Sequence, residues 1–104
     1  MQILNSTIHK SIFQYELIQR NQHFAIYAQY LDDEIIAYEV FRIKTQKAQV
    51  FTRGGKTIIL QEKELFPSNE DFGYIAFTCG NLARAEERFA QMTSEYLVKQ
   101  ISEN

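Results

Sequence analysis

The chain has 104 residues, 45% of them hydrophobic and 23% charged, and its formal net charge is −2. These values are ordinary for one soluble globular domain, and the single cysteine excludes an internal disulfide. No stretch approaches the roughly 18 consecutive apolar residues of a membrane-spanning helix, and residues 1–10 lack the basic and then apolar pattern of a signal peptide. We therefore expect a cytoplasmic protein without membrane association.

The spacing of apolar residues changes once along the chain. It alternates in short runs from Ser11 to Leu60 and becomes helical from Leu82 to Ile101. This order predicts a single α+β domain: a five- or six-stranded antiparallel sheet, in a meander, with one long C-terminal helix packed on one face. Within it we expect a loose lead-in at 1–10, the sheet at 11–78 and the helix at 81–102.

Short polar turns separate the predicted strands, which are placed at 12–20, 23–31, 34–44, 49–52 and 57–60. The strand at 34–44 carries apolar residues on both faces, which is typical of a central strand or of one covered on both sides. Gly54-Gly55 joins the last two strands. Because glycine adopts type I′ turn geometry without strain, we expect a hairpin there, with Arg53 and Lys56 at its tip.

The segment after the hairpin leads into the long helix. Pro67 ends the preceding strand, and residues 68–71 are expected to form one helical turn capped by Ser68. A short extended segment is predicted at 74–78, and Asn81 is the predicted N-cap of the helix. The apolar stripe of that helix consists of Leu82, Ala85, Phe89, Met92 and Tyr96, widened by Ala90, Leu97 and Ile101.

Charge is distributed unevenly along the chain. The charged residues between Val40 and Gln61 are all basic, whereas the remainder has 13 acidic and six basic residues. The basic residues are Arg42, Lys44, Lys47, Arg53 and Lys56. A basic hairpin on an acidic body is suited to a nucleic acid or to an acidic patch on a protein partner. The alternative is a solvated set of Lys and Arg side chains that protects a sheet edge.

Several tyrosines fall on neighbouring predicted strands, and a single helix covers only one face of a sheet. We therefore expect some of them, Tyr27 among these, to stand on an open face near Arg42 or Lys44. An exposed Tyr/Arg surface is typical of sheets that bind nucleic acid or protein. Alternatively, the rings pack among themselves or in a dimer interface, and periodicity does not decide between these arrangements.

Catalytic chemistry finds little support in the sequence. Cys79 precedes the predicted helix, where backbone N–H groups would stabilise a thiolate, but a cysteine nucleophile also needs a base. Nothing in the sequence places His9 or His23 beside it, and these residues match no metal-ligand spacing. We expect no catalytic residues, no metal and no cofactor, and hence no enzyme.

Three local features of the chain occur together. They are Tyr38-Glu39-Val40 in a strand, Phe66-Pro67-Ser68-Asn69-Glu70-Asp71-Phe72-Gly73 before the last strand, and Ala85-x-x-x-Phe89 in the helix. This arrangement covers the central and C-terminal two-thirds of the chain and resembles small phage and gut-bacterial α+β proteins whose function is not established. A strand meander closed by a helix also loosely resembles the WGR domain, which is associated with DNA binding. The Trp-Gly-Arg signature is absent, and Phe72-Gly73-Tyr74 lacks its arginine, so DNA binding is not carried over.

These observations together predict a non-catalytic binding module. The first hypothesis is a protein-interaction module, acting as a phage-type modulator of a host component or as a subunit of a small homo-oligomer. The second is a nucleic-acid-binding domain that uses the basic hairpin Arg42–Lys56. The candidate partner-binding residues are Arg42, Lys44, Lys47, Arg53, Lys56 and Tyr27.

Overall fold

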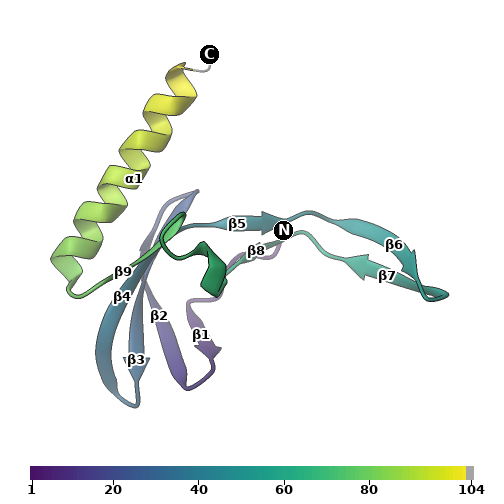
Figure 1. Cartoon of the computed structure of the whole chain (residues 1–104), viewed down its shortest axis with the longest axis horizontal. Coiled ribbons are helices and arrows are strands. Elements are labelled where there is room, and N and C mark those ends of the chain that lie inside the picture. Colours follow the sequence, from purple (N-terminus) through teal and green to yellow (C-terminus); the bar gives the residue numbers. More distant parts are fainter. Residues whose placement is uncertain (103–104) are drawn as a thin grey trace.

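The computed structural model describes residues 1–102 and consists of a five-stranded antiparallel sheet, a long C-terminal helix and a projecting arm (Figure 1). The strands of the sheet lie in the order β1-β2-β3-β4-β9. Their bounds are β1 Thr7–Lys10, β2 Phe13–Arg20, β3 Phe24–Leu31, β4 Glu34–Arg42 and β9 Ala76–Cys79, and the helix α1 spans Leu82–Ser102. The predicted α+β class and the single helix on one face are confirmed.

Local turn chemistry places several element boundaries where the sequence predicts them. The Asn21 carboxamide oxygen accepts hydrogen bonds from the backbone N–H groups of His23 and Phe24, which fixes the turn between β2 and β3. The Asn81 side chain accepts one from the backbone N–H of Arg84 at 2.9 Å and so caps α1. A 3₁₀ turn at Asn69–Asp71 follows Ser68, as expected.

The N-terminal segment is more ordered than the sequence indicates, and the expected loose lead-in at 1–10 is wrong. Residues Thr7–Lys10 form β1, which pairs with β2 from Thr7↔Glu16 to Lys10↔Phe13. Before it, Gln2 forms a parallel bridge with Lys63. These contacts lie between segments distant in sequence, so they leave no periodic signal in a stretch of ten residues.

Helix α1 packs on one face of the sheet. Its side chains Ala85 and Phe89 contact Phe24, Ile26 and Val40 of the two central strands. Both flanks of β4 are paired, with β3 and β9, so the predicted central strand is confirmed. Part of the expected apolar stripe does not reach the core, because Leu97 and Ile101 of α1 lie beyond the sheet and are exposed.

The opposite face of the sheet is also covered, although no helix lies on it. The N-terminal segment and the segment after the arm pack over it with Leu4, Ile8, Phe66 and Phe72. Tyr27 is therefore 0% exposed, and its hydroxyl donates a hydrogen bond to the backbone carbonyl of Asn5 at 2.8 Å. The expectation that Tyr27 stands on an open sheet face is wrong, because these segments bury it. Burial also raises the pKa of Tyr27 to about 12.

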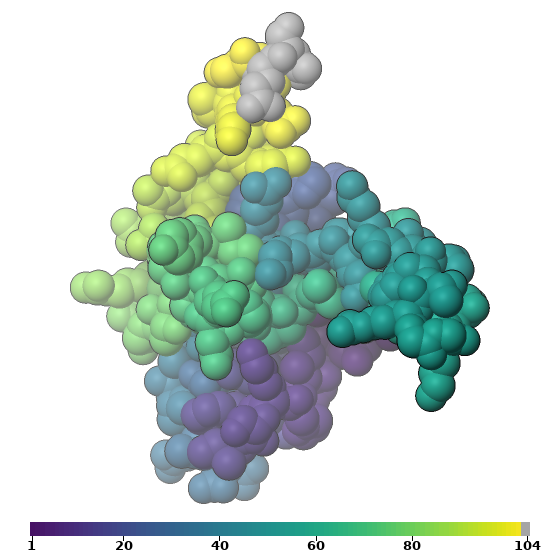
Figure 2. Space-filling view, turned by 45° about the vertical axis from the view of Figure 1, so that its right-hand side comes forward, coloured from purple at the N-terminus to yellow at the C-terminus, as the bar shows by residue number. Residues whose placement is uncertain are grey.

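The chain leaves the sheet after β4 and returns before β9, forming two further two-stranded ribbons. Their strands are β5 Lys44–Gln46 with β8 Lys63–Leu65, and β6 Gln49–Arg53 with β7 Lys56–Leu60. Figures 1 and 2 show the second ribbon projecting from the body as a separate lobe. The radius of gyration is accordingly 15.9 Å, against about 13 Å for a compact chain of this length.

No helix in the described part of the chain combines the length and the apolar character that crossing a membrane requires.

Candidate interaction surface

The distal part of the projecting ribbon, residues 47–61, is here called the arm. Its strands β6 and β7 are paired from Gln49↔Leu60 to Arg53↔Lys56, and they meet at Gly54-Gly55. Both glycines have positive φ, 60° and 77°, as the predicted type I′ hairpin requires. The arm thus has its own backbone ladder, but a two-stranded ribbon without a third element is at best marginally stable in water.

The base of the arm is fixed to the body by polar contacts. The Arg20 guanidinium donates to both carboxylate oxygens of Glu64 in β8, at 2.7 and 2.9 Å, and the backbone N–H of Leu4 donates to the same carboxylate. These hydrogen bonds, that from Arg20 foremost, hold the pKa of Glu64 below its ordinary value. On the other side Lys44 pairs with Asp71 at 2.9 Å. The arm therefore starts from a defined position, while its distal strands are free.

The exposed surface of the arm is apolar to an unusual degree for a free ribbon. Cross-strand partners share a face, so Val50 and Ile59 form one apolar pair and Phe51 and Ile58 another on the opposite face. Val50 is 71% exposed and Ile59 62%. Exposed β-branched pairs on an unpaired ribbon are a typical docking or aggregation surface.

The predicted basic residues do not form one patch. Arg42 lies at the end of β4 with its guanidinium 5.3 Å from the Tyr96 ring centroid of α1, and Lys44 is paired with Asp71 at the base of the arm. Lys47 follows β5, and Arg53 and Lys56 face each other at the tip. The structure therefore distributes these cations over four separate places.

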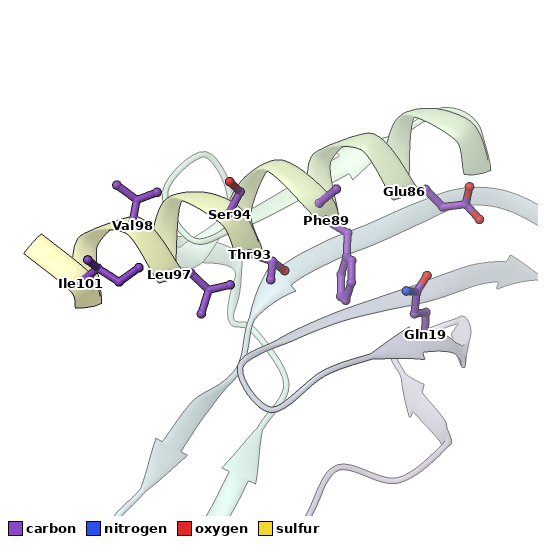
Figure 3. A pocket seen from close by; sticks show the side chains of 9 residues that line it. Gln19, Glu86, Phe89, Thr93, Ser94, Leu97, Val98 and Ile101 are labelled. Carbon is purple, nitrogen blue, oxygen red and sulfur yellow. The ribbon is translucent and has the colours of Figure 1, made fainter.

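A second apolar surface lies along α1. One side of α1 from Glu86 to Ile101, together with Gln19 near the end of β2, lines a groove of about 620 Å³. The groove contains Phe89, Thr93, Leu97 and Ile101. Figure 3 shows Phe89, Thr93 and Leu97 projecting from the same side of α1, with Gln19 of β2 opposite. Leu97 is 56% exposed and Ile101 75%. Apolar side chains are thus exposed both on the arm and along α1.

Glu39 is a buried carboxylate in the covered face of the sheet. One of its oxygens accepts a hydrogen bond from the Thr78 hydroxyl at 2.8 Å, and its backbone lies opposite Thr78 between β4 and β9. Burial is the main cause that raises the pKa of Glu39 above the ordinary 4.5, while Thr78 and the Lys10 charge oppose it. Within residues 1–102 the hydrogen-bond partner of the Glu39 carboxylate is the Thr78 hydroxyl, and we expect this buried group to affect stability.

We expect Glu39→Gln to change how stability depends on pH. A raised folded-state pKa favours the protonated native form, so the wild type loses stability as the pH rises from 4.5 through the folded-state pKa of Glu39. The amide cannot ionise, and the variant should lack this loss and be the more stable protein at neutral pH. Urea unfolding of both proteins across this range measures the difference. If the free energy of unfolding depended on pH equally in the two proteins, Glu39 would not be the group responsible for this loss.

Cys79 does not have the surroundings of a nucleophile. Its side chain packs beside the helix-facing core, and burial is the main cause that raises the pKa of its thiol. Catalytic cysteines need the opposite shift. The His23 ring instead packs against Tyr96 at 4.5 Å, and His9 is exposed in β1. Within residues 1–102 no three His, Cys, Asp or Glu side chains are grouped so as to hold a metal ion.

The residues exposed on the arm and on α1 were not among the candidate partner-binding residues predicted from the sequence. Val50 and Ile59 belong to the predicted hairpin. The local sequence pattern is the same whether a hairpin is part of the sheet or projects from it, so the exposure of these residues was not predicted. Leu97 and Ile101 have the spacing of core residues but are exposed, and the C-terminal end of α1 extends past the sheet. Comparison of the chain with protein-family models, with curated proteins and with solved structures found no match.

Proposed function

We propose that this protein is a non-catalytic protein-interaction module that associates with a second copy of itself, with the arm as its binding element. The observation that carries the proposal is the exposure of Val50 and Ile59 on a ribbon that projects from the body. Burying such a pair in an interface removes apolar surface from water and supplies the free ribbon with the packing it lacks. If the protein is instead a phage-type modulator of a host component, the same arm would bind that host protein in place of a second copy.

Protein binding accounts for the arm better than nucleic-acid binding does. A nucleic-acid surface gathers Lys and Arg along one face, with aromatic rings between them on which bases stack. Here the cations lie in four places, Lys44 is already paired with Asp71, and Tyr27 is buried. The face of the arm that carries Val50 and Ile59 offers aliphatic residues, which suit an apolar protein surface.

The double variant Val50→Ser/Ile59→Ser tests the arm directly. We expect the wild type to elute as a dimer in size-exclusion chromatography with light scattering, and the variant to associate at least about tenfold more weakly. Thr52→Ser/Thr57→Ser, on the same face of the same strands, is the matched control and should leave the dimer unchanged. A wild-type monomer, or a variant that dimerises as well as the wild type, would contradict the proposal.

The nucleic-acid hypothesis predicts a different pattern from the same proteins. Under this hypothesis the protein binds mixed-sequence oligonucleotides, with an affinity that falls steeply with added salt and is lost in Arg53→Gln/Lys56→Gln. Fluorescence anisotropy measures this binding. The protein-interaction proposal expects no such binding, and it expects the dimer to persist when those two tip cations are neutralised. If the wild type binds nucleic acid in a salt-sensitive way and the Arg53→Gln/Lys56→Gln variant does not, the function depends on these basic residues and the proposal is wrong.

A further inference from the structure

We infer that the arm of each copy lies in the α1 groove of the other copy, in a reciprocal exchange of arms. This inference rests on the proposed self-association and adds the surface that receives the arm. The two surfaces are the apolar pair Val50 and Ile59, and the groove containing Phe89, Leu97 and Ile101.

The groove matches the arm in chemistry and in length. Its lining is mostly apolar, and Leu97, Val98 and Ile101 at the C-terminal end of α1 are aliphatic. The five residues of β6 span about 17 Å in extended conformation. The helix from Phe89 to Ile101 rises about 18 Å, so one strand of the arm covers the length of the groove.

Charge favours the same pairing. The arm contains Lys47, Arg53 and Lys56 and no acidic residue, a formal charge of +3, whereas the rest of the chain has eight basic and 13 acidic residues, a charge of −5. Among the side chains that line the groove, the one with a charge is Glu86. A basic arm is therefore attracted to the acidic body of a second copy, and this attraction guides its approach and orientation.

The arm does not reach the groove of its own chain. Figure 1 shows the arm and α1 leaving the sheet in different directions, and Figure 2 shows them as separate lobes. The Arg20–Glu64 and Lys44–Asp71 contacts fix the arm's base in that orientation. Only a second copy brings arm and groove together.

Reciprocal exchange also closes the assembly. If each of two copies places its arm in the groove of the other copy, the arm and the groove of both chains are covered in a symmetric dimer. One-way docking would leave an arm free at one end and a groove free at the other, and copies would add without limit. The inference is therefore a closed dimer with two equivalent arm–groove contacts.

Variants of the groove separate this inference from the proposed function. We expect Leu97→Ser/Ile101→Ser to raise the dimer dissociation constant at least about tenfold, as the arm variant does. Both residues are exposed, so the fold is retained, and circular dichroism checks this. The matched control is Gln91→Ser, on the opposite flank of α1. If the groove variant dimerises normally while the arm variant does not, the arm binds elsewhere: the inference fails and the proposed function stands.

Disulfide cross-linking tests the contact itself. In a Cys79→Ser background, an Ile59→Cys chain is mixed with a Leu97→Cys chain of different tag length and oxidised mildly. The inference predicts a hybrid dimer, and Gln91→Cys in place of Leu97→Cys should give none. Dimers of Ile59→Cys chains with themselves, without the hybrid, would show that two arms pair with each other and would overturn the inference.

Discussion

Replacing Phe41 by Ala is expected to lower the free energy of unfolding by about 3–5 kcal/mol, the range for truncating a fully buried aromatic ring. Phe41 is 0% exposed, and its ring stacks on Tyr27 at 5.6 Å and meets Phe66 edge-on at 5.1 Å. Since Phe66 comes from the segment after the arm, the cavity would also loosen the cover over this face of the sheet. Urea unfolding followed by circular dichroism measures the change.

Phe51→Ala is the matched control for Phe41→Ala. The residue type and the truncation are the same, but Phe51 lies on the projecting arm and is exposed. We expect a change in unfolding free energy within roughly 0.5 kcal/mol at protein concentrations where the chain is monomeric. Equal effects of the two variants would mean that the aromatic cluster under the N-terminal segment is not the core of the domain.

Replacing Arg20 by Ala is expected to lower the free energy of unfolding by about 3 kcal/mol. The change leaves the Glu64 carboxylate, whose side chain is 8% exposed, with the Leu4 backbone N–H as its remaining donor. Urea unfolding at neutral pH measures the change. Lys44→Ala is the matched control, because its ion pair with Asp71 is more exposed and exposed pairs contribute about 0–1 kcal/mol.

The Arg20–Glu64 pair also predicts a pH dependence. Because the folded-state pKa of Glu64 lies below 4.5, the stabilisation by the pair is complete above that value and is lost as the pH falls through the folded-state pKa. Arg20→Ala should remove this acid-side loss, which occurs below the pH range in which Glu39 acts. A variant that keeps the wild-type stability and acid profile would show that the pair does not hold the base of the arm.

Loss of the Arg20–Glu64 pair connects stability with association. The pair and the Gln2–Lys63 bridge hold β8, and β8 with β5 sets the direction in which the arm leaves the body. An arm with a loose base must lose more conformational freedom when it binds. We therefore expect Arg20→Ala to weaken the dimer even where the chain remains folded.

The parts of the fold that could be predicted from sequence are those determined by neighbouring residues. Gly54-Gly55 defines a hairpin because the two positive φ angles favour glycine, and Asn81 marks the start of α1 because its side chain caps the helix. Apolar residues on both faces of the strand at 34–44 likewise indicate a central strand, and β4 is paired on both flanks. These are local signals, and the structure agrees with them.

The parts that could not be predicted depend on contacts between distant segments. Tyr27 has the pattern of a residue on either face, and it is buried because Asn5 and Phe66, far from it in sequence, lie over it. The arm leaves the sheet because β9, and not a strand of the arm, pairs with the free flank of β4. The periodicity of apolar residues predicts strands but not which strands pair. The exposure of Val50 and Ile59 follows from the projection of the arm, so the sequence predicted the hairpin but not its apolar surface.

The central claim, that the arm is a self-association element, is tested most directly by sedimentation velocity of the full chain over a range of concentrations. We expect a species of twice the 12.2 kDa chain mass that dissociates to monomer on dilution. Under the same conditions Val50→Ser/Ile59→Ser should remain at 12.2 kDa while Thr52→Ser/Thr57→Ser follows the wild type. A wild-type chain that stays monomeric at every concentration would contradict the claim.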